Sequence, residues 1–332
     1  MTELTSKLNV SASPHVRSPK TVTGIMLDVI IALCPALFAS FFLFGPRALA
    51  VVAVCVGVCV LSEYISRKVM KRHNTIGDLS AVVTGILLAF NLPPTIPLWM
   101  AAIGSIAAIV VVKQFFGGIG QNFINPALAG RIILLTSFPS AMAVWTKPFT
   151  WQTDAVTTAS PLASLYDSNG NFTNENLPSL LDMFLGNRAG CLGEVCAVGL
   201  ILGGIYLVIR KVISPVIPLT FIGTVGVFMF IAGGFDLEFT AYQLLSGGLL
   251  LGAIFMATDY TTSPISFKGK IIFGIGCGLV TALIRFYGNL PEGVSFAIVL
   301  MNILVPHIER LTTPKPFGTV KQKKEKKEAQ AK

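Results

Sequence analysis

Charged residues are scarce in this chain of 332 residues. They make up 12% of the sequence, against 53% for hydrophobic residues, whereas soluble globular domains carry about 25% charged residues. Histidine is also rare, with three residues, and the six cysteines show no C-x-x-C spacing. These absences argue against a zinc or iron–sulfur site within the chain. With a mean hydropathy of +0.73, the composition predicts a protein whose solvent is lipid.

The formal net charge of +9 does not point to nucleic acid. The basic residues lie in short clusters between apolar segments and in the C-terminal tail. Such a distribution is typical of membrane topology. We therefore expect no nucleic-acid partner.

The apolar segments predict an all-α integral membrane fold with about ten transmembrane helices. The predicted spans are residues 24–44, 48–66, 79–92, 96–115, 126–143, 190–209, 214–234, 241–257, 269–287 and 293–310. Lysine and arginine gather on one set of alternate loops, which the positive-inside rule places in the cytoplasm. Both termini of this multi-pass membrane protein are then predicted to be cytoplasmic.

One long connection divides the spans into two halves of five. The predicted organisation is a cytoplasmic segment at 1–23, a first half at 24–143, an external loop at 144–189, a second half at 190–310 and a basic cytoplasmic tail at 311–332. Two repeats with an odd number of spans are inverted. The third span of each half is short and ends in proline, which favours a binding site near the midplane, with two ordinary short helices as the alternative.

The external loop contains the segment D-A-V-T-T-A-S, from Asp154 to Ser160. Its small residues leave a hydroxyl accessible for a phosphoester, and its carboxylate could orient the acceptor at a modifying enzyme. From the residue types alone, an Asx or Ser/Thr turn before the following proline is the favoured explanation of the segment.

The same segment resembles the D-x-x-[ST]-x-A-[ST] acceptor sequence of proteins that carry covalent FMN, attached as a phosphoester by a dedicated flavin transferase. The resemblance makes Ser160 the attachment point, with Asp154, Thr157 and Ala159 as the rest of the motif. Many members have threonine at the last position, so serine is a departure within the permitted pair.

Longer strings resemble the D subunit of the Rnf ferredoxin:NAD+ oxidoreductase and, more distantly, the B subunit of the sodium-pumping NADH:quinone oxidoreductase. They are GDLSAVVTGILLAFNLPP (77–94), KQFFGGIGQNFINPALAGR (113–131), MATDYTTSPIS (256–266) and NLPEGVSFAIVLMNILVPHIE (289–309). The resemblance implies a translocase subunit of the bacterial cytoplasmic (inner) membrane, with external covalent FMN, room for a second, non-covalent flavin such as riboflavin, and coupling to Na+ or H+. Other subunits would exchange electrons with it, because the chain shows no nicotinamide site.

A glycine-rich inner loop, G-G-I-G, leads into a helix predicted to have Asn125 as its N-cap and Pro126 as its first residue. The N–H groups of such a terminus can bind an anion or an isoalloxazine carbonyl. Gly118, Asn122 and Asn125 are thus candidates for a second flavin site. A structural re-entrant loop is the alternative.

Carboxylates inside a membrane are costly, at roughly 2.5–3.5 kcal/mol each near a helix centre. Glu63 has a predicted partner in Arg67, four residues later. Asp28 lies one turn into the first span, and Asp78 and Asp259 border the two short spans. These three are candidates for binding Na+ or relaying protons, with Asp259 foremost, and hydrated capping positions are the alternative.

Two further alternatives stay open. Cys191 and Cys196 flank the start of a predicted span and could pair or contact a partner's cofactor. The competing functional class is a solute channel or transporter, because many permeases also build a midplane site from inverted repeats. The acceptor motif separates this class from the flavoprotein.

Overall fold

A computed structural model describes residues 20–149, 157–158, 162–165, 177–288 and 293–314. The first half contains α1 (Val22–Phe44), α2 (Pro46–Val69), η1 (Ile76–Asp78), α3 (Ser80–Phe90), α4 (Leu98–Ile106), the π-helical η2 (Ala107–Gln114), α5 (Pro126–Ser137) and α6 (Pro139–Met142). The connection contains β1 (Trp145–Thr146), β2 (Thr157–Thr158), η4 (Ala163–Leu165) and α7 (Leu180–Leu185). The second half contains α8 (Ala197–Ile209), α9 (Val216–Ala232), α10 (Leu237–Leu245), α11 (Leu249–Leu251), the π-helical η5 (Gly252–Met256), α12 (Phe267–Tyr287) and α13 (Val294–Thr312).

The helices are those of an integral membrane protein. By length and composition α1, α2, α12 and α13 can each cross a membrane, and the bent pair of α10 with α11–η5 adds a fifth crossing if it counts as one span. Shorter apolar helices, namely α3, α4–η2, α5, α8 and α9, lie at the remaining predicted spans. The all-helical membrane fold is confirmed at this level, and the number of about ten spans stays a prediction.

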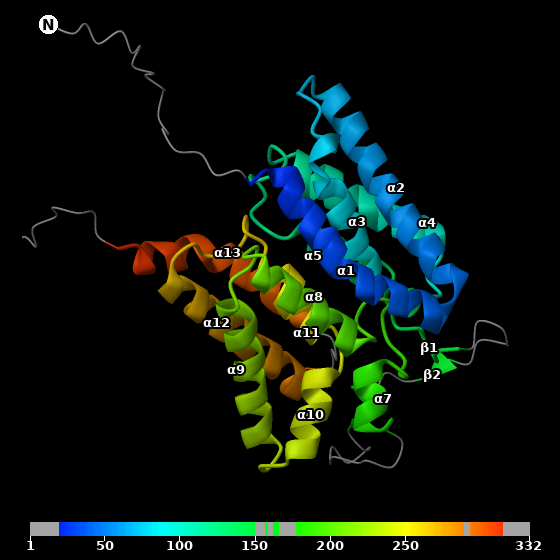
Figure 1. Ribbon diagram of the computed structural model, residues 1–332, viewed down its shortest axis with the longest axis vertical. Coiled ribbons are helices and arrows are strands. Elements are labelled where there is room, and N and C mark those ends of the chain that lie inside the picture. The colour runs from blue at the N-terminus through cyan, green and yellow to red at the C-terminus, as the bar shows by residue number, and fades with distance from the viewer. Residues whose placement is uncertain (1–19, 150–156, 159–161, 166–176, 289–292, 315–332) are drawn as a thin grey trace, which may run out of the picture.

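The two halves occupy different regions of the molecule (Figure 1), with α1 to α5 on one side and α8 to α13 on the other. They meet closely where α1 packs against α8. A Cβ atom built on Gly203 would lie 2.1 Å from the carbonyl oxygen of Ala32. Small residues at such a crossing let two helix backbones approach within van der Waals contact.

Two predicted spans are wrong in detail. The expected helix at 241–257 is bent by 64° between α10 and α11, at a break that includes Gly247 with φ of 64°. The expected span at 190–209 becomes α-helical only at Ala197. Both stretches are apolar and contain glycine, and hydropathy alone does not distinguish an interrupted helix from a continuous one.

Buried arginines contact the interrupted helices. Arg285 donates to the carbonyl oxygens of Gln243 at 2.6 Å and Ser246 at 3.0 Å, at the end of α10. Arg131 donates to Oδ1 of Asn91 at 2.6 Å, directly after α3. Since helix ends leave carbonyl groups without intrahelical partners, Arg285 stabilises the break after α10, and Arg131 holds the side chain of Asn91, the C-cap residue of α3. We call Arg131, Arg285 and these contacts the arginine network.

Candidate functional site

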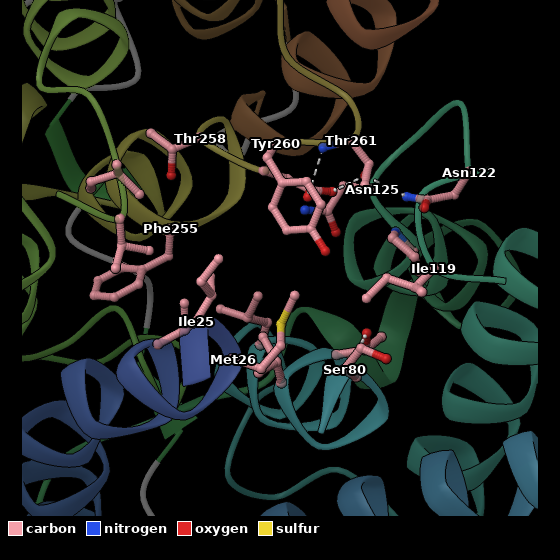
Figure 2. Close-up of a pocket in the computed structure, with 18 of the residues that line it drawn as sticks. Ile25, Met26, Ser80, Ile119, Asn122, Asn125, Phe255, Thr258, Tyr260 and Thr261 are labelled. Carbon is pink, nitrogen blue, oxygen red and sulfur yellow. Dashed lines mark hydrogen bonds between the residues drawn. The ribbon is translucent and has the colours of Figure 1, made fainter. Parts of the chain in front are cut away.

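A cavity lies between the two halves (Figure 2). Its walls come from α1, α3, η2 and the start of α5 in the first half, and from the end of α8, η5 and the following loop in the second. The cavity has a volume of about 110 Å3 and is partly open to solvent. Figure 2 shows Ile25, Met26 and Phe255 on the opposite side from Asn122 and Tyr260. We call the side with Asn122 and Tyr260 the polar wall and the side with Met26 and Phe255 the apolar wall, with Ile119 beside Asn122 and Ser80 on the side of Met26.

Asn125 joins both halves at the polar wall. Its Oδ1 accepts hydrogen bonds from the N–H groups of Ala127 and Leu128, at 3.0 and 3.4 Å, which confirms the predicted N-cap of α5 with Pro126 as the first residue. Its Nδ2 donates to the carbonyl oxygen of Met256 at 3.3 Å. The start of α5 is thereby fixed against the end of η5.

Asn122 also connects the two halves. Its Nδ2 donates to Oγ1 of Thr261 at 3.1 Å and to the carbonyl oxygen of Ile124 at 3.1 Å. Gly118 lies elsewhere on the loop, against the Arg67 guanidinium, where an added Cβ would be 1.9 Å from Nη2. Of the three residues proposed for a second flavin, Asn122 and Asn125 line the cavity, and Gly118 packs on Arg67.

Asp259 lies in the cavity wall directly after η5. Its Oδ2 accepts hydrogen bonds from the hydroxyls of Thr261 at 2.9 Å and Thr262 at 3.3 Å. Burial raises the pKa of the Asp259 carboxyl, and these threonine hydrogen bonds act in the opposite direction. The side chain is thus held on its own loop at the polar wall.

Asp78 approaches the same region from the end of η1, just before α3. Its Oδ1 accepts from the N–H of Ser80 at 2.9 Å and from the Ser80 hydroxyl, so Asp78 caps the start of α3. Its Oδ2 is buried without a hydrogen-bond partner among the described residues. Burial, followed by the charges of Asp259 and Asp78, raises the pKa of Tyr260 to about 12. Asp78 and Asp259 therefore both act on Tyr260.

Asp28 lies apart from this pair of carboxylates. It forms an ion pair with Arg210, with Nη2 at 3.3 Å from Oδ1, and accepts a hydrogen bond from the Tyr206 hydroxyl at 2.9 Å. These contacts join α1 to the end of α8. The structure thus brings together two of the three predicted carboxylates and gives the third a basic partner.

The predicted pairing of Glu63 with Arg67 is wrong. Glu63 Oε2 lies 2.8 Å from Nζ of Lys113, and both side chains are buried, with exposures of 0% and 3%. Lys113 also donates to Oγ of Ser80 at 2.6 Å and lines the cavity. No local pattern indicates this pair, because fifty positions separate its members and a lysine at the end of an apolar span resembles a topology signal.

The acceptor motif is described only in part. Thr157 lies in β2, where it is paired with Thr146 of β1. Asp154, Ala159 and Ser160 lie outside the described residues. The attachment site therefore stays a prediction.

Cys191 and Cys196 are both free thiols. Cys191 is buried, and its thiol donates to the carbonyl oxygen of Asn91 at 3.3 Å. Cys196 is the N-cap of α8, with Sγ accepting from the N–H of Gly199 at 3.4 Å. Cys191 thus contacts the end of α3 in the first half, whereas Cys196 contacts its own helix.

Known proteins match this chain along nearly its whole length. The NQR2, RnfD, RnfE family matches residues 9–318. The D subunit of the Na(+)-translocating ferredoxin:NAD(+) oxidoreductase complex of Acetobacterium woodii is 48% identical over 322 residues, covering 96% of this chain and 98% of that protein. The proton-translocating counterpart of Clostridium ljungdahlii is 44% identical, covering 93% and 96%. The D subunit of the ion-translocating oxidoreductase complex of Haemophilus influenzae is 35% identical, covering 92% and 97%.

Proposed function

Because the chain belongs to the NQR2, RnfD, RnfE family, we propose that it is the D subunit of an Rnf-type complex, which couples electron transfer between ferredoxin and NAD+ to ion movement. The full-length similarity to the D subunits of three such complexes carries this proposal. One of these relatives is named for Na+ and another for protons, so the ion is Na+ or H+. Electrons enter and leave through other subunits of the complex.

We propose the membrane arrangement that the basic residues predict. Residues 1–23 and 311–332 lie in the cytoplasm, and residues 144–189 lie outside. The halves 24–143 and 190–310 are inverted five-span repeats. Apolar helices at all the predicted positions support this arrangement, as does the interruption of each half, after α3 and within α10–α11.

Covalent FMN is proposed on Ser160, attached through a phosphoester by a flavin transferase. The acceptor pattern of Asp154, Thr157 and Ala159 supports this site. Trp145 of the adjoining β1 is buried against Ala189 and Cys191, which anchors one strand of the pairing to the membrane part. When bound, the flavin supplies the redox chemistry, and the protein sets its position and surroundings.

The cavity is proposed as the site of a second, non-covalent flavin such as riboflavin. An isoalloxazine ring has broad apolar faces and a polar edge of carbonyls and nitrogens. The apolar wall at Met26 and Phe255 and the polar wall at Asn122 and Asn125 suit these two features.

Asp78 and Asp259 are proposed to couple ion movement to electron transfer. Carboxylate and hydroxyl oxygens suit Na+ and also proton transfer. Asp78 has a buried oxygen without a hydrogen-bond partner among the described residues, and Asp259 lies among threonine hydroxyls. Asp28 ranks last among the three carboxylates, because Arg210 already pairs with it.

Flavin fluorescence in a denaturing gel tests the covalent site. The chain purified from its native host should fluoresce, Ser160→Ala should abolish the signal, and Ser160→Thr should keep it. Ser164→Ala, a change in the same connection, is the matched control. Unchanged fluorescence in Ser160→Ala would contradict the site, and a non-fluorescent wild-type chain would favour the solute channel or transporter.

A further inference from the structure

Lys113 places a buried ammonium group at the wall of the cavity. Its side chain is 3% exposed, yet it is one of the residues that line the cavity. Its partner Glu63 is fully buried behind it and does not contribute to the lining. The positive member of the pair is therefore the one that a bound molecule would meet.

Within the part of the chain that the structure describes, the hydrogen bonds of Lys113 leave one of its donors without a partner. An ammonium group has three N–H donors. Lys113 donates to Oε2 of Glu63 and to Oγ of Ser80, and the described residues provide no further acceptor. The third N–H is thus available to a molecule in the cavity.

The neighbours of Lys113 hold it in this place. The Thr75 hydroxyl donates to the other oxygen of Glu63 at 2.8 Å, and the Ser80 hydroxyl donates to Asp78. Lys113 lies near the end of the π-helical η2, and such wide turns are frequent at functional sites. A buried ammonium bonded on two sides is pre-organised, because little side-chain freedom remains to be lost when a ligand binds.

We propose that Lys113 is a positioning residue for the non-covalent flavin, donating to the polar edge of its ring and favouring the reduced, negatively charged form over the oxidised, neutral form. This inference rests on the proposed second flavin in the cavity. An ammonium group that donates to a carbonyl or ring nitrogen binds more strongly when that edge becomes anionic. Of the nearby carboxylates, Glu63 pairs with Lys113 itself, Asp78 accepts from Ser80, and Asp259 accepts from Thr261 and Thr262.

A redox titration of the non-covalent flavin in the purified whole complex tests the inference. In Lys113→Gln the preference for the reduced flavin should fall at least tenfold, which lowers the midpoint potential by about 30 mV for a two-electron couple. Lys113→Arg should retain most of the preference, and the potential of the covalent FMN should not change. Lys268→Gln, at an exposed lysine, is the control for loss of a charge.

A double variant separates the effect of Lys113 on the flavin from a loss of folding. Lys113→Gln alone leaves the Glu63 carboxylate buried without its cation, which is strongly destabilising. The double variant Glu63→Gln/Lys113→Gln removes both charges, and complex size together with covalent fluorescence reports its assembly. A lowered potential, or loss of the extractable flavin from the assembled double variant, supports the inference.

Different results would contradict the role of Lys113 and the presence of the second flavin. A wild-type potential in the assembled double variant would overturn the role of Lys113 and leave the second flavin in place. A wild-type complex that releases no flavin on acid extraction would instead contradict the second flavin itself, and the inference with it.

Discussion

The cavity wall and the arginine network are both buried and polar, but they use their cations differently. Arg285 donates to backbone carbonyls at the end of α10, so its guanidinium takes the place of helical N–H donors. Lys113 donates to side chains and has a remaining donor beside a cavity. One cation thus completes the fold, and the other can contact a ligand.

Side chains pack tightly around the arginine network and less tightly around the cavity wall. A Cβ built on Gly247 would lie 3.0 Å from Nη2 of Arg285, and one on Gly248 would lie 3.5 Å from Nη1 of Arg131. The break between α10 and α11 is therefore enclosed by these two arginines. Beside Lys113 the bundle instead leaves a cavity that is partly open to solvent.

Among these variants, Arg131→Leu should lower the thermal stability of the protein most. The change leaves Oδ1 of Asn91 and the hydroxyl of Ser295 without this donor, where Arg131 now contacts them at 2.6 and 3.1 Å. Unsatisfied buried groups cost about 1–3 kcal/mol each, so we expect a thermal midpoint lowered by several degrees and a smaller yield of assembled complex.

Lys68→Leu, at an exposed cation, is the control for Arg131→Leu and should leave the thermal midpoint nearly unchanged. If Arg131→Leu assembled normally but shifted a flavin potential, the division between a structural and a ligand-facing cation would be wrong.

Much of the fold follows from the sequence, because hydropathy and caps are local signals. The ends of α1 and α12 fall within two residues of the predicted spans, and Asn125 caps α5 as expected. The break at Gly247 is different, since it depends on Arg285 from another helix. Such long-range stabilisation leaves no trace in a window of neighbouring residues.

The candidate site could be predicted in part for the same reason. Asp78, Asp259, Asn122 and Asn125 were predictable because they border helix ends, where polar groups are needed. Lys113 was not, because its importance depends on the burial of Glu63, fifty residues away, and on the π-helical turn of η2. Both are properties of packing that no local pattern encodes.

A smaller effect on the fold, but a clear effect on function, is expected for Asp259→Asn. The amide can still accept from Thr261 and Thr262, so stability and flavin content should stay close to wild type. Ion-dependent turnover of the complex should fall by about tenfold, or ~1.4 kcal/mol in activation free energy, because the carboxylate charge is lost. Asp182→Asn, a half-buried carboxylate of α7 in the connection between the halves, is the control, and normal ion-dependent turnover in Asp259→Asn would remove Asp259 from the coupling site.

The smallest change in thermal stability is expected for Asp28→Asn. This variant tests a solvent-exposed ion pair that belongs neither to the cavity wall nor to the arginine network. Arg210 is 57% exposed, so its ion pair with Asp28 is open to solvent, and such pairs contribute at most about 1 kcal/mol. The thermal midpoint should fall only slightly, and the difference from wild type should shrink further at high salt because exposed charges are screened. In the double variant with Arg210→Gln, the two changes should give little more than the single change, since both remove the same pair. A large loss of ion-dependent turnover in Asp28→Asn, with unchanged thermal stability, would instead place this carboxylate with Asp78 and Asp259 and extend the coupling site to the contact between α1 and α8.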